Sequence, residues 1–231
     1  AYTSIDDPSE YFQAYAYKGN GTDARALTLP GDTDMAPNLV WVKQRNTTRN
    51  HIVANSVCGA SKNLYADLND PEDGISGPIT AFGSDGFTVS SSANVNEDSG
   101  TYASWSWNES ATAGFDIVTY TGNQTARTIS HSLSAAPHMY IIKNRDTAEN
   151  WQVFHHKNTS APETDYVTLN TTVGTADHTL IANDTMPTSS VFSVGTDAST
   201  NKSSSPMVAF LFTGIQGYSK FGSYEGNGDA D

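Results

Sequence analysis

Residues 37–46 read PNLVWVKQRN, and a closely related stretch, PHMYIIKNRD, follows at residues 137–146. Each stretch begins with a proline and continues with a short run of apolar residues rich in valine, isoleucine and aromatic side chains. Short runs of this composition are typical of β-strands, and the proline marks where each strand begins. The sequence therefore predicts a strand that occurs twice in the chain.

Other segments repeat in the same order, which extends the match beyond a single strand. They predict two tandem units of about 105 residues, a size typical of a β-sandwich. We place the first unit at residues 1–110 and the second at residues 111–231, which also includes the first strand of a truncated third unit. The matched pairs are residues 17–21 with 120–124, 50–53 with 150–153, 87–89 with 192–194, and 102–107 with 207–212, and residues 224–228 repeat the first of these segments.

The rest of the sequence favours an all-β fold. Residues 102–107 and 207–212 carry large side chains at alternate positions, the two-residue period of a strand. The chain contains 18 glycines and is rich in serine, threonine and asparagine, which suit turns. No segment of ten or more residues has a convincing helical period, and residues 108–114 have the small, polar composition of a linker.

The charge balance excludes several classes of partner. The chain has 12 Lys and Arg against 25 Asp and Glu, a formal net charge of −13. Nucleic acids and anionic membrane surfaces need a basic protein surface, so we expect neither as a partner. No apolar run reaches the roughly 18 residues of a membrane-spanning helix. The chain does not begin with methionine, and we expect it to be a piece of a longer or processed protein.

We find no motif for catalysis, for a cofactor or for a metal ion. Cys58 is the only cysteine and lies among small apolar residues, so we expect an inert buried thiol. The six histidines are scattered without ligand spacing, and His155 and His156 should point to opposite faces of a strand. The acidic segments at residues 31–34 and 67–74 do not fit a calcium-binding loop, and we interpret them as solvated turns.

Aromatic residues and glycosylation motifs supply the remaining candidate sites. The four tryptophans all fall in strand-like segments, and core packing accounts for most of them. We name Trp41 and Trp151 as candidate glycan contacts. Eight asparagines stand in Asn-x-Ser/Thr motifs and are candidate glycosylation sites: Asn20, Asn46, Asn108, Asn123, Asn158, Asn170, Asn183 and Asn201.

Nearly the whole chain resembles tail-fibre-like tandem-repeat structural proteins of tailed marine bacteriophages that infect cyanobacteria and Pelagibacter-type hosts. The resemblance implies β-sandwich units of the concanavalin or jelly-roll kind, exposure on the virion and continuation of the chain beyond residue 231. It implies no catalytic residue. The segments that carry it are residues 7–13, 37–45, 50–53, 55–62, 82–89, 115–122, 129–133, 136–137 and 217–224.

The sequence and this resemblance together predict a non-enzymatic virion protein without a cofactor. It would form part of a tail fibre, spike or capsid decoration on the virion surface and present loops for host-surface adsorption. We expect a homo-oligomer, with a trimer favoured, that contacts other virion proteins and a host surface glycan. Two alternatives stay open, namely a carbohydrate-binding module of a secreted or cell-surface protein and a purely architectural capsid or filament protein. A polysaccharide-degrading enzyme would require two acids facing each other in a cleft.

Overall fold

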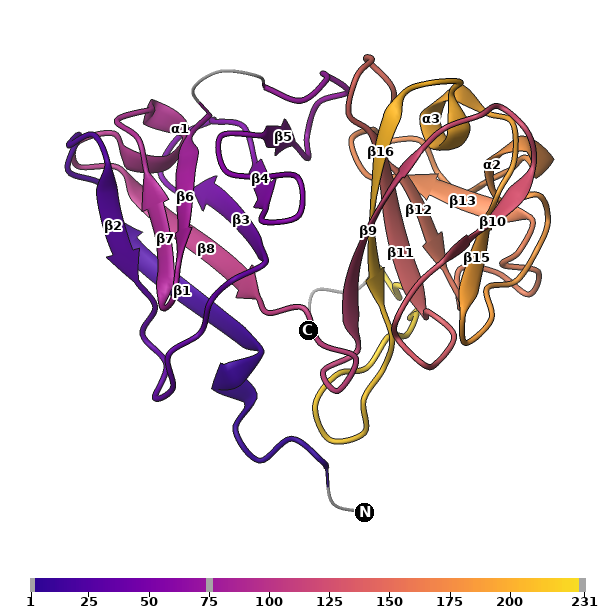
Figure 1. Cartoon of the computed structure of the whole chain (residues 1–231), viewed down its shortest axis with the longest axis horizontal. Helices are drawn as coiled ribbons and strands as arrows, with labels where there is room; N and C mark the ends of the chain where they lie inside the picture. The colour runs from indigo at the N-terminus through magenta and orange to yellow at the C-terminus, as the bar shows by residue number, and fades with distance from the viewer. Residues whose placement is uncertain (1–2, 74–76, 229–231) are drawn as a thin grey trace.

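The computed structural model describes residues 3–73 and 77–228, and it confirms an all-β fold made of antiparallel sheets (Figure 1). The helical elements are single turns, as the lack of helical periodicity predicted. None of the helices in the described part of the chain has the length and apolar character needed to cross a membrane. The helical turns are η1 (Pro8–Glu10), α1 (Ala93–Asn96), α2 (Thr179–Ala182) and α3 (Ala198–Asn201).

The strands between residues 12 and 107 form two facing sheets, which we call the N-terminal sandwich. Its strands pair antiparallel throughout, and the inner faces of the two sheets enclose one cluster of buried apolar side chains. The large sheet has the order β1 (Phe12–Lys18), β8 (Thr101–Trp107), β3 (Leu39–Gln44), β4 (Ile52–Asn55) and β5 (Asn63–Tyr65), and the small sheet β2 (Arg25–Thr28), β7 (Gly86–Val89) and β6 (Ile79–Gly83).

The strands between residues 115 and 212 form a second pair of sheets, the C-terminal sandwich. The chain passes from one sandwich to the other between β8 and β9, through the segment predicted as a linker. The large sheet has the order β14 (Ala176–Asp177), β13 (Asp165–Thr168), β12 (Gln152–His155), β11 (Met139–Asn144), β16 (Pro206–Phe212) and β9 (Phe115–Thr121), and the small sheet β10 (Arg127–Ser130) and β15 (Val191–Val194).

The two sandwiches have corresponding strand orders. In both large sheets the first strand pairs with the last, the last with the third, and the third with the fourth. The segments matched in the sequence occupy corresponding positions, with β3 and β11 each lying between the last and the fourth strand. The division of the chain at residue 110 remains an inference from these correspondences.

Three clusters of buried apolar residues stabilise the molecule. One lies between the sheets of the N-terminal sandwich, around Tyr17, Ile52 and Phe87. A second lies inside the C-terminal sandwich, around Tyr140 and Phe192. The third lies between the two large sheets, which pack against each other through their outer faces (Figure 1). We call this third cluster the shared core: Leu39, Val53, Leu64, Ala66, Phe115, Ile117, Ile141, Trp151, Val153, Val208 and Phe210.

The shared core explains why several strands do not alternate between buried and exposed residues. β4 is buried at all four positions, and β16 is buried from Met207 to Leu211. A strand with apolar residues on both faces needs cover on both faces. The small sheet covers one face of each large sheet, and the opposite sandwich covers the other.

The expected first strand of a third unit is not formed. Residues 213–228 follow β16 without entering a sheet, and the Tyr224 side chain is 95% exposed. The matching tyrosines are held by partners in their own sandwiches, since the Tyr17 hydroxyl donates to the Val95 carbonyl and the Tyr120 hydroxyl to the Thr200 carbonyl. The described residues place no such partner on Tyr224, and a strand without a neighbour leaves its backbone groups unpaired.

Candidate functional site

An aromatic surface lies on the outer face of the N-terminal large sheet, beside the shared core. Trp41 of β3 and Trp105 of β8 are direct partners on neighbouring strands, so their side chains leave the sheet on the same face. His51, just before β4, packs edge-on against Trp41 with ring centroids 6.0 Å apart. These three residues line an open pocket of about 250 Å³, and we call them the aromatic platform.

A second, smaller pocket adjoins the aromatic platform and reaches the C-terminal sandwich. It measures about 130 Å³ and shares Trp41 and His51 with the first pocket. Ala66 and Asp67, after β5, and Leu169, after β13, complete its walls. The site therefore lies where the two sandwiches meet, and both contribute to its lining.

Hydrogen bonds fix the orientation of the polar groups at this site. The Trp41 Nε1–H donates to His51 Nδ1 at 3.0 Å, and the His51 backbone N–H donates to Asp67 Oδ1 at 2.8 Å. Because Nδ1 accepts a hydrogen bond, the neutral imidazole carries its proton on Nε2. Burial lowers the pKa of His51, and the nearby Asp67 carboxylate opposes this effect. The ring is therefore neutral near pH 7.

Of the two tryptophans predicted to contact glycans, the structure leaves one accessible. Trp41 is half-buried and lines both pockets. The prediction for Trp151 was wrong, because this side chain is 1% exposed and belongs to the shared core. Its Nε1–H donates to the carbonyls of Tyr65 and Leu68 in the other sandwich. The sequence did not predict Trp105 as a site residue. Its place beside Trp41 can be inferred only once β3 and β8 are known to be neighbours.

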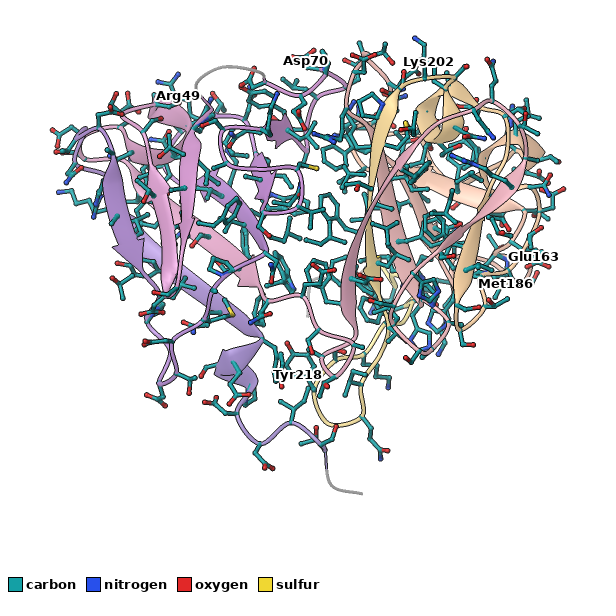
Figure 2. The ribbon with its side chains drawn as sticks, in the orientation of Figure 1. Arg49, Asp70, Glu163, Met186, Lys202 and Tyr218 are labelled. Atoms are coloured by element: carbon teal, nitrogen blue, oxygen red, sulfur yellow. The ribbon has the colours of Figure 1, made fainter. Side chains whose placement is uncertain are left out.

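The acidic segment before residue 74 joins the two sandwiches. Glu72 forms a bidentate ion pair with Arg145. The Arg145 Nε donates to Glu72 Oε2 at 2.6 Å, and its Nη2 donates to Oε1 at 3.1 Å. The Lys143 amine donates to the Asn69 carbonyl at 3.1 Å. The Tyr65 hydroxyl donates to the Asp73 carboxylate. Asp70 lies in the same loop (Figure 2). These bonds make the segment a structural connection, whereas the sequence indicated only solvated turns.

The second acidic segment, at residues 31–34, packs against the beginning of the chain. The Thr33 hydroxyl donates to the Asp7 carboxylate at 2.5 Å, and the Gly31 backbone N–H donates to the Gln13 side chain at 2.7 Å.

Within residues 3–73 and 77–228, no group of three or more histidine, cysteine, aspartate or glutamate side chains is arranged to hold a metal ion.

The remaining reactive side chains are a thiol and a histidine cluster. Cys58 is partly buried beside the shared core, and burial raises the pKa of its thiol, which disfavours the reactive thiolate. His138 and His156 stack with ring centroids 4.2 Å apart, in contact with the segment that follows β16. The Gly214 backbone N–H donates to His138 Nδ1 at 2.9 Å, which ties this segment to the C-terminal sheet.

A pair of carboxyl groups lies where the linker between the sandwiches meets β9, with Glu109 in the linker and Asp116 in the strand. Glu109 Oε1 accepts a hydrogen bond from the Ile117 backbone N–H at 3.3 Å, and Asp116 Oδ2 accepts one from Ser132 N–H at 2.6 Å. Burial, together with a side-chain hydrogen bond to Asp116, raises the pKa of Glu109 to about 7. Glu109 therefore keeps its proton to a higher pH than an ordinary glutamate. Nothing in the sequence singles out this pair, because its members are seven positions apart in a loop and a strand.

The predicted glycosylation sites differ in accessibility. Asn20, Asn46, Asn123 and Asn183 are exposed, and Asn108, Asn158 and Asn170 are half-buried. Asn201 was predicted wrongly, because it is 0% exposed and its amide donates to the carbonyls of Thr125 and Gly195 at 2.9 and 2.6 Å. A buried amide with these bonds cannot carry a glycan.

Together these features define an all-β protein with two packed sandwiches and an aromatic surface site where they meet. The chain belongs to the DUF7483 family, described as a domain of unknown function, and the family profile matches residues 7–231. Searches of curated proteins and of solved structures give no match to the chain.

Proposed function

We propose that the chain is a structural part of a phage virion, in a tail fibre, spike or capsid decoration, where it presents loops for host-surface adsorption. The observation that carries this proposal is the packing of two sandwiches into one body through the shared core. A structural role requires a unit that keeps its shape, and a fibre requires units that hold their neighbours at a fixed spacing.

Polar and charged contacts add to the rigidity of this junction. Arg145 and Glu72 are 16% and 8% exposed at their side chains, so water screens this ion pair only weakly. Trp107 of the first sandwich packs against Phe115 and Phe212 of the second, with ring centroids 6.4 and 6.3 Å away. Figure 2 shows the side chains that fill the space between the two sandwiches. Two sandwiches fixed in this way support the proposed role as a spacer.

The proposed role is physical and needs neither a catalytic residue nor a cofactor. Many copies on one particle convert weak individual contacts into strong attachment. We propose a homotrimer as the assembled form, in contact with other virion proteins. The net charge of −13 suits an outward-facing surface and disfavours contact with the packaged genome.

The proposal is tested on the virus that encodes the chain. Antibody fragments raised against the purified chain should label intact particles in electron micrographs and slow their adsorption to host cells. Labelling without an effect on adsorption would favour the purely architectural alternative. A chain missing from purified particles, as judged by mass spectrometry, would refute a virion role and favour the carbohydrate-binding module of a secreted or cell-surface protein.

A further inference from the structure

We propose that the aromatic platform of Trp41, Trp105 and His51 binds a sugar ring of a neutral glycan, with Asp67 and His51 forming hydrogen bonds to its hydroxyl groups. The inference names the ligand class of the adsorption function proposed above, and it rests on that function only for its biological setting. Binding itself is a property of the isolated chain.

The platform has the shape that a sugar ring requires. The two indoles stand side by side on adjacent strands, which are about 4.8 Å apart in a sheet. Ala14 is the partner of Trp105 on the other side and is exposed, so its small side chain leaves that flank of the indole open. The apolar C–H face of a pyranose can therefore lie on the electron-rich faces of the rings.

The rim of the platform provides both a donor and an acceptor. His51 Nδ1 is occupied by the Trp41 indole, which leaves Nε2–H as the donor of the ring. Asp67 is exposed and uses Oδ1 for the His51 backbone, while a carboxylate has about four acceptor positions in total. Neighbouring sugar hydroxyls both donate and accept hydrogen bonds, so the His51 donor and the Asp67 acceptor complement them. A purely apolar ligand would leave both groups without a hydrogen bond.

The charge of the site and of the chain selects for neutral sugars. Asp67 places a carboxylate at the rim, and the whole chain carries a net charge of −13. Glycans with uronate or sulfate groups would be repelled at low ionic strength. The equivalent surface of the C-terminal sandwich is closed, because Ile141, Trp151 and Phe210 lie in the shared core. Each chain therefore offers one such platform, and several chains would be needed for strong attachment.

The experiment measures migration of the purified chain through native gels containing a soluble polysaccharide. Three gels contain neutral polymers, a β-glucan, an α-mannan and a galactan, and a fourth contains alginate, a uronate polymer. We expect at least one neutral polymer to retard the chain and alginate to leave it unretarded. Migration of the chain unchanged in all three neutral gels, or retardation only by alginate, would overturn the inference.

Three variants locate the binding site. Trp105→Ala should weaken binding about tenfold, the loss expected when one stacking surface is removed. Asp67→Asn keeps the hydrogen bond to His51 but removes the charge, and it should weaken binding by a smaller factor. Tyr224→Ser removes a fully accessible aromatic ring elsewhere on the chain and should leave binding unchanged.

The outcomes separate this inference from the proposed function. Retardation that survives both Trp105→Ala and Asp67→Asn would place the sugar elsewhere and refute the platform, whether or not the chain is found in virions. Asp67→Asn decides the matter if Trp105→Ala fails to fold, because Asp67 is on the surface. A chain that binds a neutral glycan through the platform but is missing from virions would refute the virion role alone.

Discussion

Buried asparagines hold the turn that follows the first strand of each sandwich. Asn201 Oδ1 accepts from the Asn123 backbone N–H at 3.0 Å, and its amide donates to the carbonyls of Thr125 and Gly195. Asn96 occupies the corresponding position at the end of α1 and is also 0% exposed. These amides connect segments that are far apart in sequence, which explains why a polar side chain is retained in the interior.

Replacing Asn201 with alanine should destabilise the protein by about 2–4 kcal/mol, because the change leaves the buried Gly195 carbonyl and the partly buried backbone groups of Asn123 and Thr125 without this partner. Urea unfolding followed by far-UV circular dichroism measures this loss. Asn158→Ala is the matched control, since its side chain accepts one exposed hydrogen bond from Thr175. An equal effect of the two substitutions would contradict the role assigned to Asn201.

The raised pKa of Glu109 makes stability depend on pH. The folded state holds Glu109 with a pKa of about 7, compared with 4.5 for an unperturbed glutamate, so the folded state binds more protons between these values. Stability should therefore fall as pH rises from about 4.5 to about 7. We expect a loss of about 1 kcal/mol, less than full burial would give, because water screens the partly exposed Glu109 side chain.

Glu109→Gln should remove this dependence and make the protein more stable than the wild type at pH 7.5, since a neutral amide can occupy the partly buried position without losing a proton. Thermal melts at pH 5 and pH 7.5 report the difference. Glu225→Gln, at an exposed position in the segment after β16, is the control and should follow the wild type. A slope that persists in Glu109→Gln would assign the titration to other groups.

At the scale of elements, close backbone contacts hold the first strand of each sandwich against the loop before its last strand. A Cβ atom on Gly122 would lie 2.0 Å from the Lys202 carbonyl oxygen, and one on Gly19 would lie 2.1 Å from the Glu97 carbonyl oxygen. The obstructing atoms belong to the backbone, so a side-chain rotation cannot relieve either contact. Glycine is therefore required where β1 and β9 end.

Gly122→Ala should cost about 1–3 kcal/mol through displacement of the loop between α3 and β16. Gly174→Ala is the matched control, because no atom lies within 4 Å of the position its Cβ would take. Chemical denaturation of both variants tests the prediction. Similar midpoints for the two would show that the loop yields at little cost.

The sequence predicted those strands whose apolar runs are short and β-rich. Residues 39–43 and 139–143 form the greater part of β3 and β11, as expected. The first strand of a third unit was predicted from the repeat at residues 224–228 and is not formed, because pairing depends on a neighbour that local sequence does not specify. Strand propensity thus identifies what can join a sheet, and the partner decides whether it does.

At the scale of the whole molecule, the shared core makes the two sandwiches a single packing unit. Trp151 is the largest of its fully buried residues, and its indole also donates hydrogen bonds to backbone carbonyls of the other sandwich. Side chains buried between two bodies couple their unfolding, since neither can unfold without exposing the surface of the other.

We expect the wild-type chain to unfold in one calorimetric transition and Trp151→Ala to unfold in two, with a lower total stability. Loss of a buried tryptophan costs about 3–5 kcal/mol, and here the loss falls on the contact between sandwiches. Phe192→Ala is the control, because Phe192 is equally buried but lies inside the C-terminal sandwich. Two transitions in the control, or one in Trp151→Ala, would contradict this coupling.

The candidate site could be predicted from the sequence only in part, because the packing of the two sandwiches decides which side chains stay accessible. Trp41 and Trp151 look alike as tryptophans in strand-like segments. Trp41 lines a pocket, whereas Trp151 is covered by the N-terminal sandwich, and that difference arises from how the two sandwiches pack. The apolar runs of β4 and β16 are buried on both faces, and their sequences do not specify what covers the second face.

The accessibility of the Lys143 amine to chemical reagents reports on the junction between the sandwiches. Its side chain is fully buried, and its amine donates to the carbonyls of Asn69, Asn144 and Thr147. Burial also lowers its pKa to about 8. An amine-directed acylating reagent should therefore leave Lys143 untouched while it modifies the exposed Lys18. Once the sandwiches separate, the unmasked amine would become accessible to the reagent, and peptide mass spectrometry could follow the opening without an introduced probe.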